Sequence, residues 1–275
     1  MSKRPPCRTL KTIGKFLIFD LDPFLIFTLE PLMERGEYHL IAEYFDKIEL
    51  WHDEPEGKTS ISTRDPKFKN IVKHVPLLNR LILLTSSESF FQEVLSSVLP
   101  EEARNYRLFT KNPLWNFINF LKNKKIIRIN HQLSLMPRGS LISPHTDRIG
   151  KLLSICCYFP DLSQEGRSDL GTVFHEFGVN QYKYFNLENR NLREGLESFP
   201  NFNDEVIEAY RASFDPGEMC GFVKNEYSWH SVDIVSTDKR RSMNINFVEV
   251  SIWRELRNKV GAGGKWSKLR KKLAY

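Results

Sequence analysis

Hydrophobic and polar positions change their spacing near residue 125 of this chain. Before that point, two segments carry apolar residues at helical spacing. Residues 85–88 have a capping-box pattern and predict the start of a helix that Pro100 ends. Asn112 and Pro113 predict a second helix. We expect its buried side to consist of Leu114, Trp115, Phe117, Ile118 and Leu121. Residues 1–125 are therefore interpreted as a mixed α/β region that packs on the rest.

After residue 125 the pattern becomes one of short apolar runs divided by turn residues. The predicted strands are 126–130, 132–136, 151–159, 171–177, 218–223, 229–235 and 240–250. Many short strands with regular turns favour a β-barrel or β-sandwich core, here over residues 126–253. Residues 180–211 interrupt the pattern, and we expect an insertion with a short helix near 204–210. Residues 51–65 are polar and predict a loop.

Composition and charge narrow the functional class. The chain has 275 residues with 41% hydrophobic content, and no apolar run is long enough to predict a transmembrane helix. The net charge is +6, but residues 254–275 carry eight Lys or Arg and one acid, so the excess belongs to a basic tail. We interpret this tail as solvated, or as a weak attachment to an anionic surface, and do not expect nucleic-acid binding. The four cysteines fit neither a disulfide framework nor a zinc knuckle, which favours a cytoplasmic location.

Candidate chemistry centres on His145, Asp147 and His230. A histidine and a carboxylate two positions apart point the same way from a strand, and a distant second histidine completes the 2-His-1-carboxylate set that binds non-haem Fe(II). The alternative is an accidental His-x-Asp sequence together with a half-buried strand histidine. Arg241 follows in the alternating strand 240–250, on the same face as the apolar residues Met243, Ile245 and Phe247. An arginine that points into a core needs an anion, either a bound carboxylate or a structural Asp or Glu.

Several segments in order resemble the Fe(II)/2-oxoglutarate-dependent oxygenases, particularly their prolyl-hydroxylase-like branch. They lie within residues 128–250 and comprise Pro-Arg-Gly-Ser at 137–140, Pro-His-Thr-Asp at 144–147, the strand ending in Tyr158, Gly-Thr-Val-Phe at 171–174, Pro-Gly at 216–217, Trp-His-Ser-Val at 229–232 and Arg-Ser at 241–242. The chain departs from many members at Asp169-Leu170-Gly171, where they have Gly-Gly before this element.

The resemblance implies a mainly β fold with flanking helices around a double-stranded β-helix, also called a jelly-roll or cupin-like core. It implies that His145, Asp147 and His230 are the metal-binding and catalytic set, and that Arg241 binds the C5 carboxylate of 2-oxoglutarate, with Tyr158 beside it. The alternative for Tyr158 is core packing.

The implied reaction is hydroxylation by a dioxygenase that uses Fe(II), 2-oxoglutarate and O2, with ascorbate as a possible support. We expect a small-molecule substrate. Two alternatives stay open: a hydroxylase of a protein or peptide side chain, and a jelly-roll protein that is non-catalytic or binds metal without 2-oxoglutarate.

Overall fold

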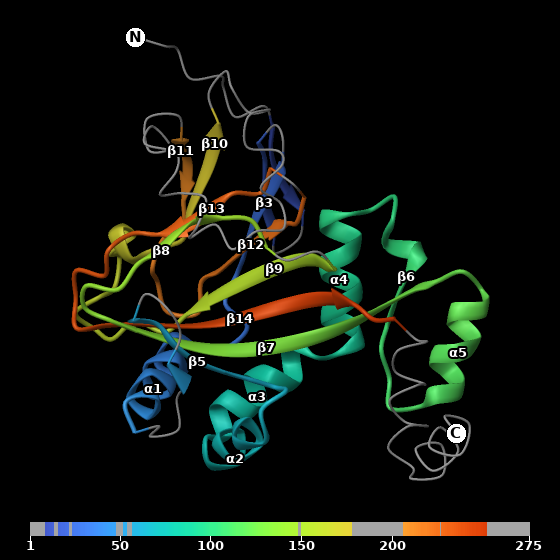
Figure 1. Cartoon of the computed structure of the whole chain (residues 1–275), viewed down its shortest axis with the longest axis horizontal. Helices are drawn as coiled ribbons and strands as arrows, with labels where there is room; N and C mark the ends of the chain where they lie inside the picture. The colour runs from blue at the N-terminus through green and yellow to red at the C-terminus, as the bar shows by residue number, and fades with distance from the viewer. Residues whose placement is uncertain are drawn as a thin grey trace, which may run out of the picture.

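Two β-sheets of unequal size form the centre of the protein (Figure 1). The computed structural model describes residues 9–13, 16–21, 24–47, 52–53, 57–147, 150–177, 206–225 and 227–251. In the large sheet the strand order is β1 (Thr9–Ile13), β2 (Phe16–Leu21), β3 (Phe24–Leu29), β12 (Met219–Val223), β9 (Lys151–Tyr158), β14 (Lys239–Glu249), β7 (Lys125–Pro137), β5 (Thr59–Ser62) and β4 (His52–Asp53). In the small sheet it is β11 (Val206–Arg211), β10 (Val173–Phe177), β13 (His230–Val232) and β8 (Ile142–His145). All these neighbours are antiparallel, and β6 (Tyr106–Leu108) adds a parallel pair with β7.

The strands from β7 to β14 pass back and forth between the two sheets. β7, β9, β12 and β14 lie together in the large sheet, and β8, β10, β11 and β13 make up the small one. Eight strands in two facing antiparallel sheets with this order constitute a double-stranded β-helix. The predicted jelly-roll core is thus confirmed.

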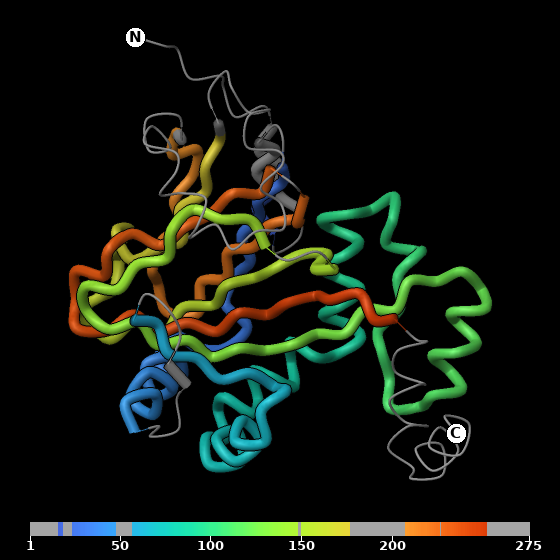
Figure 2. Tube along the Cα trace, viewed as in Figure 1, coloured from blue at the N-terminus to red at the C-terminus, as the bar shows by residue number. Residues whose placement is uncertain are grey.

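The large sheet is buried on both of its faces. Outward-facing residues of β14, namely Met243, Ile245 and Phe247, belong to a hydrophobic core shared with helices α1 (Arg35–Phe45), α2 (Pro66–His74), α3 (Pro76–Thr85) and α4 (Glu88–Val98). A second core lies between the sheets and includes Met136, Phe174 and Phe222. The large sheet therefore separates a helix-covered core from the interior of the jelly roll (Figure 2).

Local sequence explains the ends of the helices. Asp65, Ser87 and Asn112 are N-caps whose side-chain oxygens accept hydrogen bonds from backbone amides in the first turns of α2, α4 and α5 (Pro113–Leu121). Short 3₁₀ helices are η2 (Ala103–Asn105) and η3 (Ser168–Leu170). The turn before β12 needs Gly217, which has a φ of +72° and whose missing Cβ leaves room for the ring of Tyr38.

The secondary-structure predictions were right for α4, α5, β9, β10, β12 and β14, and wrong at several other points. The two strands predicted at 126–130 and 132–136 are one continuous strand, β7. The predicted loop 51–65 contains the hairpin of β4 and β5, because β5 pairs with the exposed edge of β7. The predicted helix at 204–210 is wrong: residues 206–211 form β11, whose backbone pairs with β10. The rest of the predicted insertion, 180–205, and the whole basic tail, 254–275, lie outside the described residues.

The orientation predicted for α5 is also wrong. Its buried side chains are Asn116 and Asn119, whereas Leu114, Trp115 and Leu121 are 65%, 50% and 63% exposed. Asn116 accounts for part of this orientation, since its amide group accepts a hydrogen bond from the Thr110 amide and donates one to the Thr110 carbonyl. The asparagines of α5 therefore have backbone partners, Phe117 and Ile118 are half-buried, and Leu114, Trp115 and Leu121 are left at the surface.

Candidate metal and anion site

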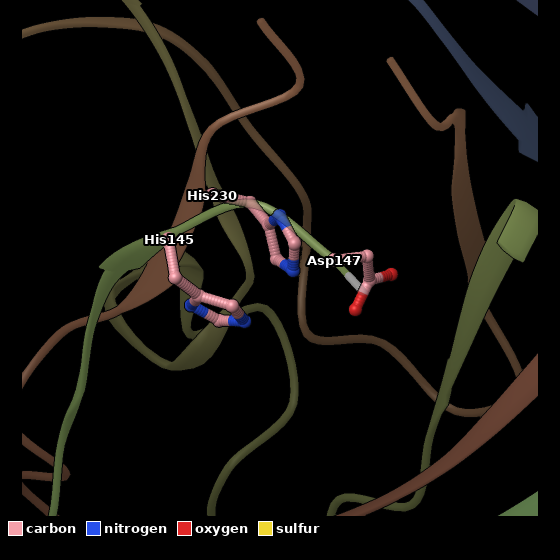
Figure 3. A group of neighbouring side chains, drawn as sticks. All are labelled: His145, Asp147 and His230. Carbon is pink, nitrogen blue, oxygen red and sulfur yellow. The ribbon is translucent and has the colours of Figure 1, made fainter. Parts of the chain in front are cut away.

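Two neighbouring strands of the small sheet bring the predicted metal ligands together. His145 ends β8, Asp147 follows it by two residues, and His230 begins β13, where it is the register partner of His145. One ligand atom from each of the three residues lies within 4.8 Å of the others, and the imidazole centroids are 4.3 Å apart. Figure 3 shows the three side chains around one common space.

Hydrogen bonds fix the tautomer of both histidines. The Nδ1 atom of His145 lies 2.9 Å from the carbonyl oxygen of Ser143, and that of His230 lies 3.1 Å from the carbonyl oxygen of Ser228. A carbonyl only accepts, so each Nδ1 carries the proton and each Nε2 keeps a lone pair. Burial lowers the pKa of both rings, and that of His230 falls to about 3, with its neighbour His145 adding to the effect. Both imidazoles are thus neutral donors near pH 7.

The third member, Asp147, is held as an anion. Its Oδ1 lies 2.6 Å from Lys151 Nζ, and its Oδ2 accepts a hydrogen bond of 2.5 Å from Ser154 Oγ. Burial by itself raises the pKa of Asp147, but the charge of Lys151 and these two hydrogen bonds outweigh it and hold the pKa well below its usual range. Two neutral nitrogens and one carboxylate therefore face the same space, which is a suitable donor set for a divalent transition metal.

The triad opens into a cavity of about 330 Å³ between the two sheets. Its β14 wall consists of Arg240, Ser242, Asn244 and Asn246, which alternate with the outward-facing apolar residues of the same strand. The other charged residues that line it are Lys58, Asp147 and Lys151. The interior of this jelly roll is therefore polar on its β14 side.

Arg241 does not reach this cavity, which contradicts its predicted role. Its guanidinium forms a two-pronged ion pair with Asp46 at the C-terminal end of α1, with Nη2 to Oδ2 at 2.9 Å, and Nη1 lies 3.4 Å from Asp161 Oδ2. The alternation along the strand was read correctly, but the apolar face meets the helices and not the jelly-roll interior. The structural salt bridge that was the alternative for Arg241 is what the structure contains.

Arg240 occupies the place expected of Arg241. It is 2% exposed, lines the cavity, and lies over the ring of Tyr158 at 5.3 Å. Its Nε donates to the carbonyl oxygen of Leu170 at 2.6 Å, and its Nη atoms have longer contacts to Ser242 Oγ at 3.3 Å, Thr172 Oγ1 at 3.4 Å and Met136 Sδ at 3.8 Å. Within the described ranges, no carboxylate pairs with this buried cation. Sequence reasoning missed it because the apolar face of strand 240–250 was taken to be the face that points into the interior.

Tyr158 supports the cavity wall from behind. It is fully buried, its hydroxyl donates to Thr172 Oγ1 at 2.7 Å and accepts from the Thr172 amide at 3.2 Å. Burial raises the pKa of Tyr158, so the phenol stays protonated and can donate. It is not among the residues that line the cavity, so it acts on the site through Thr172 and Arg240.

None of the helices in the described part of the chain has the length and apolar character that crossing a membrane requires.

No known family description matches the sequence, and no curated protein matches it either. Among solved structures, a prolyl-4-hydroxylase from Pseudomonas putida matches over 82% of this chain and 92% of its own, with 12% identity and a TM-score of 0.41. HygX from Streptomyces hygroscopicus, solved with nickel and 2-oxoglutarate, matches over 81% and 82%, with 12% identity and a TM-score of 0.41. The epimerase SnoN from nogalamycin biosynthesis matches over 81% and 78%, with 13% identity and a TM-score of 0.44.

Proposed function

We propose that this protein is an Fe(II)- and 2-oxoglutarate-dependent oxygenase that hydroxylates an unactivated C–H bond of a small-molecule substrate. One observation carries the proposal: a convergent triad of two neutral histidines and one aspartate shares a cavity with a buried arginine that no described carboxylate neutralises. Metal and anion sites in one cavity match a metal enzyme with an anionic co-substrate.

The triad fits Fe(II) by the chemistry of its donors. Nε2 of His145, Nε2 of His230 and a carboxylate oxygen of Asp147 make three ligands and leave further coordination positions for other molecules. Ser154 and Lys151 orient the carboxylate, and the carbonyls of Ser143 and Ser228 orient the rings. When bound, Fe(II) with 2-oxoglutarate supplies the activation of O2, and the reaction releases succinate and CO2.

Arg240 holds the co-substrate in this proposal. A planar guanidinium binds a carboxylate with two parallel hydrogen bonds, and its two Nη atoms have only weak contacts to give up. Leu170 and Tyr158 fix the position of the guanidinium, and Thr172 offers its hydroxyl beside it. The distal carboxylate of 2-oxoglutarate would thus be fixed at Arg240, and its 2-oxo acid end would be directed toward the triad.

The cavity size favours a small substrate. A volume of about 330 Å³ has to hold 2-oxoglutarate and the reacting part of the substrate together. Hydroxylation of a protein or peptide side chain is the second candidate, since a single side chain would also fit this space.

Succinate formation tests the proposal. Purified protein with Fe(II), ascorbate, O2 and 2-oxoglutarate is expected to form succinate slowly without its substrate, and Asp147→Ala is expected to abolish this. If the protein forms no succinate and also fails to bind 2-oxoglutarate in the presence of metal, the proposal is wrong and a 2-oxoglutarate-independent or non-catalytic jelly roll replaces it. Binding that needs both metal and Arg240, without turnover, would show that only the substrate is missing.

A further inference from the structure

Helix α5 presents apolar side chains to solvent at one end of the molecule, remote from β8 and β13 (Figure 1). Leu114, Trp115 and Leu121 are each at least half exposed, and no other helix in the described residues exposes three large apolar side chains. The helix turns its asparagines inward, where Asn116 bonds Thr110 and Asn119 donates to the carbonyl oxygen of Trp115. Large apolar side chains grouped on an exposed helix indicate an interaction surface.

The chain segment that contains α5 carries charges of one sign. Residues 103–130 contain seven Lys or Arg and no Asp or Glu. Lys111 precedes the helix, while Lys122, Lys124 and Lys125 follow it. Lys111 and Lys122 are exposed, and Lys125 has a 55% exposed side chain that forms a long, exposed ion pair with Glu249 at 3.8 Å. Both ends of an exposed apolar helix are thus positively charged.

We propose that α5 and its flanking lysines form a peripheral docking site for an anionic membrane surface. Leucine and tryptophan side chains enter the boundary between headgroups and acyl chains, and lysines at the helix ends contact lipid phosphates. The chemistry is less suited to a nucleic acid, because the exposed residues are largely aliphatic and would not stack on bases. It is also less suited to a second copy of this chain, because two such basic surfaces would repel each other.

Sedimentation with lipid vesicles tests this proposal on the full chain. Vesicles of phosphatidylcholine with roughly one third phosphatidylserine are compared with vesicles of phosphatidylcholine alone. Leu114→Gln with Trp115→Gln is expected to lower the partition coefficient on the anionic vesicles at least tenfold. Lys122→Gln is expected to lower it roughly fivefold. The matched control is Leu83→Gln with Leu84→Gln on α3, which removes two exposed leucines from another helix and is expected to leave partitioning unchanged.

Several results would overturn the proposal. Equal partitioning on the two kinds of vesicle would show that anionic lipid is not what the protein recognises. An equal loss of partitioning in the α3 control would show that α5 is not the specific docking site. Binding that survives the α5 substitutions would belong to another segment, for example the basic residues 254–275, which these variants leave intact. A dimer that the α5 substitutions dissociate, or a nucleic acid that binds in preference to vesicles, would assign the face to those partners instead. Succinate formation should be the same in all these variants, so failure here leaves the proposed reaction untouched.

Discussion

Replacing Arg240 and replacing its neighbour Arg241 should affect 2-oxoglutarate binding very differently. In Arg240→Met, 2-oxoglutarate loses two hydrogen bonds from a cation to its carboxylate, each contributing about 1.5–3 kcal/mol. Taking the lower value for both gives about 3 kcal/mol, or roughly 150-fold in Kd. In Arg241→Met, the Kd for 2-oxoglutarate should stay within about twofold, because Arg241 lies on the other face of β14 and bonds Asp46.

Arg241→Met should instead lower the free energy of unfolding. Its pair with Asp46 is partly exposed on the acid side, at 38%, and Lys239 stays 3.0 Å from the same carboxylate, so the loss is about 1–2 kcal/mol and not the larger penalty of a fully buried pair. Titration calorimetry of 2-oxoglutarate with Mn(II) in place of iron, together with urea unfolding, measures both quantities. If Arg241→Met abolishes binding while Arg240→Met preserves it, the assignment of the anion site is wrong.

Three other changes test further parts of the structure. Burial lowers the pKa of His131 to about 4, so the stabilisation that the neutral ring provides is complete above about pH 6.5 and is lost as the pH falls. The unfolding free energy of the metal-free protein should therefore drop between pH 7 and pH 5, and His131→Leu should make this drop smaller by about 2 kcal/mol. A drop of the same size in the variant would contradict this. Ser154→Ala removes a hydrogen bond to Asp147 and should weaken metal binding about tenfold in equilibrium dialysis, whereas unchanged affinity would mean that Ser154 does not orient the carboxylate. Gly221→Ala would place its Cβ 2.4 Å from the Phe27 ring and should cost about 1–3 kcal/mol in thermal unfolding; an unaffected midpoint would show that the ring moves aside freely.

The metal ligands could be predicted because their signal is mostly local. His145 and Asp147 stand two residues apart at a strand end, and alternation places them on one side. The partnership with His230 depends on the pairing of β8 with β13, which joins residues 85 positions apart. Strand order of that kind is set by the packing of the whole jelly roll. Local sequence patterns therefore could not predict that His230 joins the other two ligands, and the resemblance to a known family was what suggested it.

The arginine was misplaced for a physical reason. In β14 both strand faces are buried, one against helices and one against the cavity, so an apolar face does not identify the interior. The polar series Ser242, Asn244 and Asn246 was the available signal, since a polar face on a strand in the middle of a barrel indicates a polar cavity. Arg240 begins that series.

Helix α5 was misread through the same assumption. Its apolar residues were assigned to the core because amphipathic helices ordinarily bury them. The asparagines at 116 and 119 instead bond backbone groups on the inner side, and the absence of acids from residues 103–130 was the sequence signal for an external partner.

Metal content and its coupling to 2-oxoglutarate binding test the central claim most directly. After anaerobic loading with Fe(II) and removal of excess metal, the protein should retain one iron per chain, and single variants His145→Ala, Asp147→Ala and His230→Ala should each lose it. The protein should then bind 2-oxoglutarate only in the metal-loaded form. Iron that stays bound in all three variants, or 2-oxoglutarate binding that is indifferent to metal, would contradict a shared metal and co-substrate site in this cavity.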